Sequence, residues 1–178
     1  GTAPNHTFTL EGGKRQSVHL DELPGLADAE VSTKVSSDRP VCAERAVYFV
    51  YDGKQGGHDS IGFTAPTVDW YLAEGYTGGQ FDTWVLVQNP GAETATVTLS
   101  FQLTKGTAPN HTFTLEGGKR QSVHLDELPG LADAEVSTKV KATDPYGNPL
   151  PVVAERAMYF VYEGKQGGHD SIGVPELF

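Results

Sequence analysis

The chain has 178 residues, of which 38% are hydrophobic and 10% aromatic, which is enough for a packed core and argues against disorder. Its formal net charge of −10 argues against binding nucleic acid or an anionic membrane through a basic surface. Cys42 is the single cysteine, which excludes an intrachain disulfide. No apolar run reaches the roughly 20 residues of a membrane span, so we expect no membrane insertion in this segment.

Most of the sequence occurs twice. Residues 1–35 recur letter for letter as residues 106–140, and residues 43–62 recur as residues 154–173 with 18 of 20 positions unchanged. Residues 63–105 occur once. A repeat of this length predicts tandem domains.

The repeat also predicts where the domains lie. We expect residues 69–173 to form one complete repeat, of the size of a small sandwich domain, between the short linkers 63–68 and 174–178. Residues 1–62 correspond to the C-terminal half of a preceding repeat. They would leave an open sheet edge by themselves, so we expect them to adopt the fold of residues 106–173 with strands supplied from outside the chain.

Almost every segment of the complete repeat has the pattern of a β-strand, and residues 94–104 alternate strictly between apolar and polar. In chain order the expected strands are 69–75, 81–90, 94–104, 111–115, 121–125, 134–140 and 151–164. Seven strands at this spacing predict an all-β fold, an immunoglobulin-like antiparallel β-sandwich, with a closed barrel as the alternative. The apolar residues expected in its core are Val97, Leu99, Phe101, Phe113, Leu115, Val123, Leu125, Val136 and Val140, with Trp84 beside them.

Two connecting segments carry turn signals. Residues 141–153 are six residues longer than their counterpart 36–42 and contain Asp-Pro-Tyr-Gly-Asn-Pro, which predicts the tip of a hairpin between the last two strands. We expect Gly-Gly-His-Asp-Ser-Ile-Gly, residues 167–173, to be a loop that closes the repeat. Cys42 stands where the second copy has Val153, which predicts a small buried side chain.

Four motifs together resemble a known family. They are WYLAEGY (70–76), FDTWVLVQNP (81–90), VAERAMYF (153–160) and GGHDSIG (167–173). They look like an uncharacterised bacterial family whose members occur as tandem copies in large secreted or cell-surface proteins. The resemblance covers residues 69–173 and implies an extracellular protein built from β-sandwich repeats, without implying catalysis.

A charged pair lies inside an apolar strand of each copy, as Glu44-Arg45 and as Glu155-Arg156. Neighbours in a strand face opposite sides, so the two members of a pair cannot contact each other. Arg156 shares a face with apolar residues and therefore needs a carboxylate or backbone carbonyls from another strand. We expect structural ion pairs, or contacts between domains or subunits, at these four residues.

Several aromatic residues gather around one predicted turn. Trp70, Tyr71, Tyr76 and Trp84 could form an exposed platform that stacks on sugar rings, with Phe81 nearby. Side chains of this kind more often fill a sandwich core, and we favour that interpretation.

The remaining sequence motifs provide little evidence of a functional site. The consecutive His-Asp-Ser at 58–60 and 169–171 has the letters of a hydrolase triad, but consecutive residues of an extended chain point apart. Asn5 and Asn110 begin glycosylation sequons. No metal-ligand spacing is present, so we expect no metal and no cofactor at the histidines considered, which are His19, His58, His124 and His169.

Three functions compete at this point. The first is a structural repeat of an extracellular filament, stalk or surface layer, whose partners are copies of itself joined end to end. The second is a cell-surface adhesin that binds glycans or a host protein through its loops. The third, an enzyme, finds no support in any motif, so we expect no catalytic residues.

Overall fold

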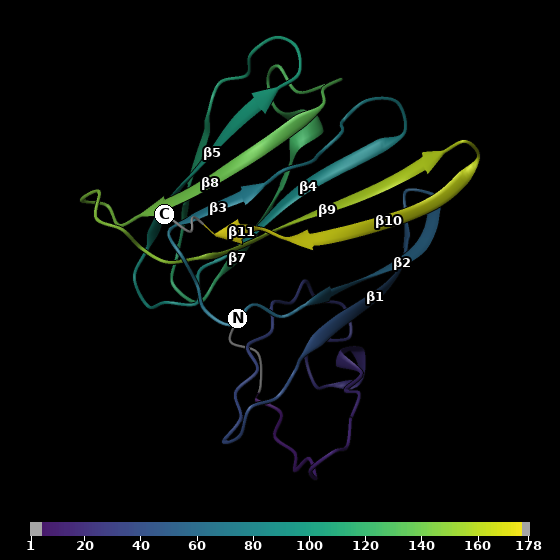
Figure 1. Ribbon diagram of the computed structural model, residues 1–178, viewed down its shortest axis with the longest axis vertical. Helices are drawn as coiled ribbons and strands as arrows, with labels where there is room; N and C mark the ends of the chain where they lie inside the picture. Colours follow the sequence, from purple (N-terminus) through teal and green to yellow (C-terminus); the bar gives the residue numbers. More distant parts are fainter. Residues whose placement is uncertain (1–4, 176–178) are drawn as a thin grey trace. The chain divides into compact units, whose positions relative to one another are not determined.

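The computed structural model describes residues 5–175 and divides the chain into two compact units, Gly1–Lys34 and Val35–Phe178. Every strand in the described residues belongs to the second unit (Figure 1). Residues 5–175 contain no α-helix, only two short 3₁₀ helices, η1 (Leu20–Glu22) and η2 (Leu125–Glu127). None of the described helices is long and apolar enough to span a membrane.

The second unit is an all-β antiparallel sandwich, as the strand pattern predicts. One sheet has the order β10-β9-β4-β7 and the facing sheet has the order β11-β3-β8-β5-β6. The strands of the first sheet are β10 (Lys165–Ile172), β9 (Val153–Tyr162), β4 (Phe81–Gln88) and β7 (Arg120–His124). Those of the second are β11 (Val174–Pro175), β3 (Asp69–Leu72), β8 (Val136–Thr143), β5 (Ala95–Leu103) and β6 (His111–Leu115).

Apolar side chains at alternate positions of the strands fill the space between the two sheets. Val97 and Leu99 of β5 and Val140 of β8 are fully buried, and Phe101 and Phe113 lie partly buried at the edge of this core. The other residues predicted for the core that are buried there are Leu115, Val123, Leu125 and Val136. Trp84 is the exception, because β4 turns Val85 and Val87 inward and Trp84 outward.

The last predicted strand and the closing loop form a hairpin instead. β9 pairs with β10 from Glu155↔Ile172 to Tyr162↔Lys165, so Gly-Gly-His-Asp-Ser-Ile is a strand rather than a loop. The chain reverses at Glu163 and Gly164, which both have positive φ. Two successive positive φ values make the tight hairpin turn that matches strand twist. Residues 69–173 therefore form eight strands, β3 to β10, instead of the expected seven, and β11 follows them.

Two connecting segments also differ from expectation. Residues 141–153 do not join β8 and β9 as a hairpin, because those strands belong to different sheets. The segment instead makes a short hairpin of its own, in which Thr143 bridges Pro149. The expected linkers partly join the sandwich. Thr67 bridges Val152, and β11 pairs with β3 as an edge strand.

The first copy does not repeat the second in full. Residues 6–35 contain no strand, although residues 111–140, with the same letters, hold β6, β7 and part of β8. The local turns are nevertheless the same, since φ is 70° at Gly13 and 69° at Gly118. The ladders are missing because β4 and β5, which pair with β7 and β6, have no equivalent beside residues 5–34 in the described chain.

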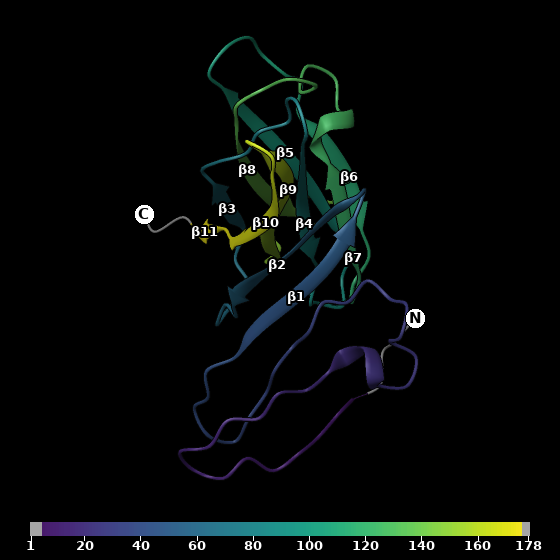
Figure 2. The same cartoon turned by 90° about the vertical axis from the view of Figure 1, so that its right-hand side faces the viewer.

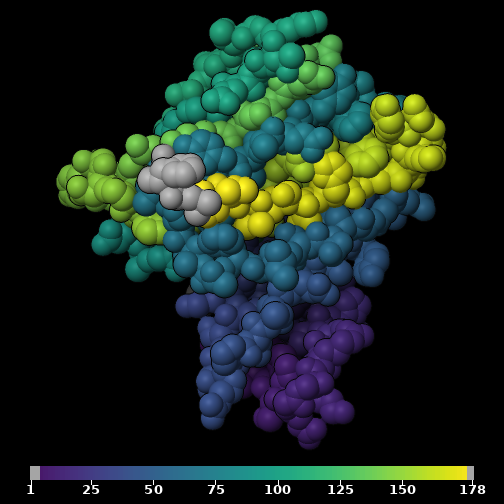
Figure 3. Space-filling model, viewed as in Figure 1, coloured from purple at the N-terminus to yellow at the C-terminus, as the bar shows by residue number. Residues whose placement is uncertain are grey.

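The end of the first copy does form strands. β1 (Glu44–Tyr51) and β2 (Lys54–Ile61) make a separate two-stranded sheet that turns at Asp52-Gly53. This hairpin packs with one face on the outer side of β9 and β10, within the second unit (Figures 1 and 2). The space-filling view shows the hairpin in blue against the yellow β9–β10 pair (Figure 3).

Candidate functional site: two arginine clusters on one hairpin motif

The first cluster lies inside the sandwich and centres on Arg156 of β9. Its side chain is buried, with 5% of the residue exposed. Nη1 donates to the backbone oxygen of Glu74 at 2.6 Å and to its carboxylate at 3.1 Å, and Nη2 lies 2.9 Å from Nδ1 of His169. A buried guanidinium is stable only with such partners, because its desolvation is costly.

The contact with Arg156 fixes the state of His169. A guanidinium has only donors, so Nδ1 of His169 must accept and the ring must be neutral with its proton on Nε2. Burial lowers the pKa of His169, and the charge of Arg156 lowers it further. Asp170 points to the opposite side of β10, and so the consecutive His-Asp-Ser residues do not converge as a catalytic triad.

The second cluster lies outside the sandwich and centres on Arg45 of β1. Its Nη1 donates to Oε1 of Glu155 at 2.9 Å, and its Nη2 donates to Oδ2 of Asp170. Nδ1 of His58 lies 3.1 Å from Oδ1 of the same Asp170, whose side chain is fully buried. Glu44, on the other face of β1, is exposed. Of the four charged residues singled out in the sequence, Arg156 therefore belongs to the first cluster and Arg45 and Glu155 belong to the second, while Glu44 belongs to neither.

Aromatic side chains surround the second cluster. Phe49 meets Tyr159 edge to face, with ring centroids 4.8 Å apart, and Tyr51 lies 4.8 Å from the same ring. Gly168 makes room for this contact, because a Cβ there would lie 2.7 Å from the Phe49 ring. Burial raises the pKa of Tyr159. We call Arg45, Phe49, Tyr51 and His58 the hairpin inner face, and Glu155, Tyr159 and Asp170 the acceptor face.

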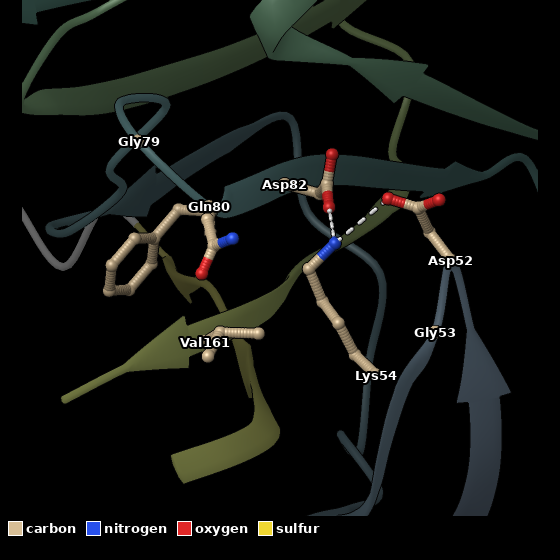
Figure 4. Close-up of a pocket in the computed structure, with 8 residues that line it drawn as sticks. Asp52, Gly53, Lys54, Gly79, Gln80, Asp82 and Val161 are labelled. Carbon is tan, nitrogen blue, oxygen red and sulfur yellow. Dashed lines mark hydrogen bonds and ion pairs between the residues drawn. The ribbon is translucent and has the colours of Figure 1, made fainter. Parts of the chain in front are cut away.

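Lys54 holds the turn end of the hairpin to β4 (Figure 4). Its Nζ donates to Oδ2 of Asp82 at 2.7 Å and to Oδ2 of Asp52 at 3.1 Å, in a shallow hollow that Gln80 and Val161 also line. Burial acts to lower the pKa of Lys54, but the hydrogen bonds to the two carboxylates outweigh it and raise the pKa.

A group that sequence spacing could not reveal lies beside this ion pair. One ligand atom each from Asp82, His124 and Asp126 lies within 4.8 Å of the others. These residues come from β4, β7 and η2, so no short motif connects them. Their composition could hold a cation, and the Lys54 ammonium already lies against Asp82. Burial raises the pKa of Asp126.

The aromatic residues of the predicted platform do not share a surface. Trp70 is fully buried, and its Nε1 donates to the backbone oxygen of Val152 at 2.9 Å. Tyr71 points the other way, under the ammonium of Lys139. Trp84 lies on the outer side of the other sheet, stacked on His124 with ring centroids 4.2 Å apart. A single platform is therefore absent from the described residues.

The remaining predicted positions are half-buried or exposed. Tyr76 stacks edge to face on Phe81. Asn5 and Asn110 of the two sequons are exposed. Cys42 is exposed as well, contrary to the expected burial, because the segment before β1 has no sheet to cover it.

One comparison with known proteins supports the fold, and none of them indicates a function. No family model matches the chain, and no curated protein matches it. The crystal structure of Thermotoga maritima 1070 is similar at a TM-score of 0.55 and 19% identity, over 62% of this chain and 96% of that one. The Anabaena sensory rhodopsin transducer matches at a TM-score of 0.40 and 19% identity, over 50% of this chain and 92% of that chain.

Proposed function

We propose that this chain is a structural repeat module that assembles end to end with further copies, in an extracellular filament, stalk or surface layer. One observation carries the proposal. Residues 111–140 form ladders where β3, β4 and β5 flank them, and the same letters at 6–35 form none where those strands are absent. A segment that needs the first half of a repeat beside it is suited to a continuous array.

Other features agree with a structural role. The repeats are nearly identical, and consecutive units are separated by only a few residues. The net charge of −10 favours solubility of a crowded array. We also propose a cell-surface location, on the resemblance of the four motifs to secreted tandem repeats. The alternative of a glycan-binding adhesin draws no support from the aromatic residues, which are dispersed over different faces.

Electron microscopy of the native material tests the proposal. We expect rods or fibres with an axial repeat of one sandwich domain, and labelling of intact cells by an antibody against the chain. Isolated globular particles, or labelling that appears only after cell lysis, would refute the structural and surface roles.

A further inference from the structure

The hairpin inner face of the first copy and the matching face of the β9–β10 hairpin in the second copy have different surroundings. In the first copy, Arg45 and Phe49 contact the acceptor face outside the sandwich. In the second copy, Arg156 occupies the same motif position as Arg45 but faces the interior, where it bonds Glu74 and His169. The sequence of the hairpin does not explain the difference, because the two copies differ here only at Val47/Met158 and Asp52/Glu163.

The strands beside each hairpin explain why its two copies face different surroundings. β9 pairs with β4 from Phe81↔Phe160 to Gln88↔Val153, which places one face of β9 against the opposite sheet. β1 pairs only with β2 among the described residues, so its inner face has no sandwich of its own to cover. It covers the acceptor face instead.

We propose that residues 5–61 bind a segment with the sequence of residues 69–103 from another copy of the repeat, and that this binding moves the β1–β2 hairpin off the acceptor face. The hairpin inner face would then lie in the interior of the newly completed sandwich. The inference deepens the proposed end-to-end assembly, on which it rests, by naming the partner segment and its consequence.

The second copy gives the register of the bound segment. Leu10 lies opposite Ala95 of the donor, as Leu115 lies opposite Ala95 within the chain. Arg45 lies opposite Val85 of the donor, as Arg156 does here. Binding covers apolar side chains that are now exposed, such as Phe8 at 45% and Leu10 at 39%. Burial of apolar surface and completion of the ladders both favour the exchange.

The two positions of the hairpin exclude each other. Arg45 cannot pair with Asp170 outside the sandwich while it lies between the sheets of its own repeat. Completion of the first copy therefore exposes the acceptor face, with Glu155, Tyr159 and Asp170. Without the donor segment, the hairpin stays on that face.

Hydrogen exchange with mass spectrometry tests the binding. The chain is compared with an extended chain that carries a second copy of residues 63–105 ahead of Gly1. Peptides from residues 6–35 and 111–140 have the same sequence, so a single peptide reports both copies. We expect two isotope envelopes in the present chain, one exchanged and one protected, and a single protected envelope in the extended chain. Two envelopes in the extended chain, or loss of protection altogether, would overturn the proposal.

Two substitutions test the movement of the hairpin, through the exchange rate of residues 43–62, which differ in mass from residues 154–173. In the present chain, Asp170→Asn and Arg45→Gln should each speed exchange at least about tenfold, because each breaks the ion pair between Arg45 and the fully buried Asp170. In the extended chain Arg45→Gln should keep its effect, and Asp170→Asn should change the rate less than about twofold.

Two results in the extended chain would contradict the proposed movement of the hairpin. If Asp170→Asn still speeds exchange about tenfold in the extended chain, the hairpin has not moved. If Arg45→Gln has no effect there, Arg45 has not entered the interior. Either result refutes the exchange of positions. Globular particles in the native material would instead refute the proposed filament and leave these results intact.

Discussion

Substitution of Arg156 tests the buried network most directly. Arg156→Ala leaves Nδ1 of His169 and the backbone oxygen of Glu74 without their donor and opens a cavity at a buried position. Both hydrogen bonds are partly buried, and an acceptor left unpaired in the interior costs about 1–3 kcal/mol. The carboxylate of Glu74 adds little, because 72% of it is exposed and water screens the ion pair. We expect a total loss of about 3–5 kcal/mol in the free energy of unfolding.

Urea unfolding with a fixed slope measures this loss. Arg156→Met keeps much of the volume without the charge, so it should cost about 1–2 kcal/mol less than Arg156→Ala. Glu74→Gln is the matched control and should cost less than about 1 kcal/mol, because the backbone oxygen still accepts from Arg156. A loss below about 1 kcal/mol for Arg156→Ala would show that the guanidinium is not a structural requirement of the sandwich.

Three further outcomes are expected. The pKa of His169 is lowered in the fold. The free energy of unfolding should therefore contain the full contribution of neutral His169 above the ordinary histidine pKa of about 6.5, and it should fall as the pH drops below that value. His169→Asn should reduce this fall in urea titrations at pH 7.5 and 5.5, and an unchanged pH dependence would contradict it. Leu99→Ala should cost about 3–5 kcal/mol and Phe101→Ala about 1–3 kcal/mol, since only Leu99 is fully buried, and a larger loss at Phe101 would reverse that ranking. Cys42 should react with a thiol reagent in the native protein at the rate of a free thiol, whereas reaction only after unfolding would show it covered.

Strict alternation predicted the sandwich correctly where one face was wholly apolar. In β5 the polar face is Thr96, Thr98 and Ser100, so only one orientation buries the apolar residues. β4 is ambiguous, because Trp84 and Leu86 on one face compete with Val85 and Val87 on the other. Asp82 and Gln88 share the face of Trp84, and this was the signal for an outward orientation.

The sequence does not predict the two hairpins, because a pair of glycines such as those in β2 and β10 is typical of a loop. Asp52-Gly53 and Glu163-Gly164 stand between two extended runs and adopt the positive φ values of a tight two-residue turn. Asp-Gly between alternating residues is a strong hairpin signal, and it was present in the sequence. The glycine pair that follows belongs to β2 and β10, where it lets another chain segment approach closely.

Arg156 could be assigned to a face from the sequence, but its partners could not be named. Glu74 follows β3, and His169 lies on β10, which was expected to be a loop. The group of Asp82, His124 and Asp126 has the same difficulty, because the pairing of β4 with β7 brings it together. Contacts across strands depend on register, which a single sequence without a correct strand list does not provide.

The identical segments separate what is encoded locally from what is not. Both copies form a 3₁₀ turn at Leu-Asp-Glu and carry glycines with nearly equal φ, 79° at Gly25 and 82° at Gly130, so the turn chemistry resides in the segment itself. The ladders appear only where β4 and β5 are adjacent, so β-structure here is a property of the pair of strands. Within a complete repeat β3, β4 and β5 precede β6, β7 and β8 in the chain. The strands that pair with β6, β7 and β8 are therefore synthesised before them, and the ladders form only when the later strands lie beside the earlier ones.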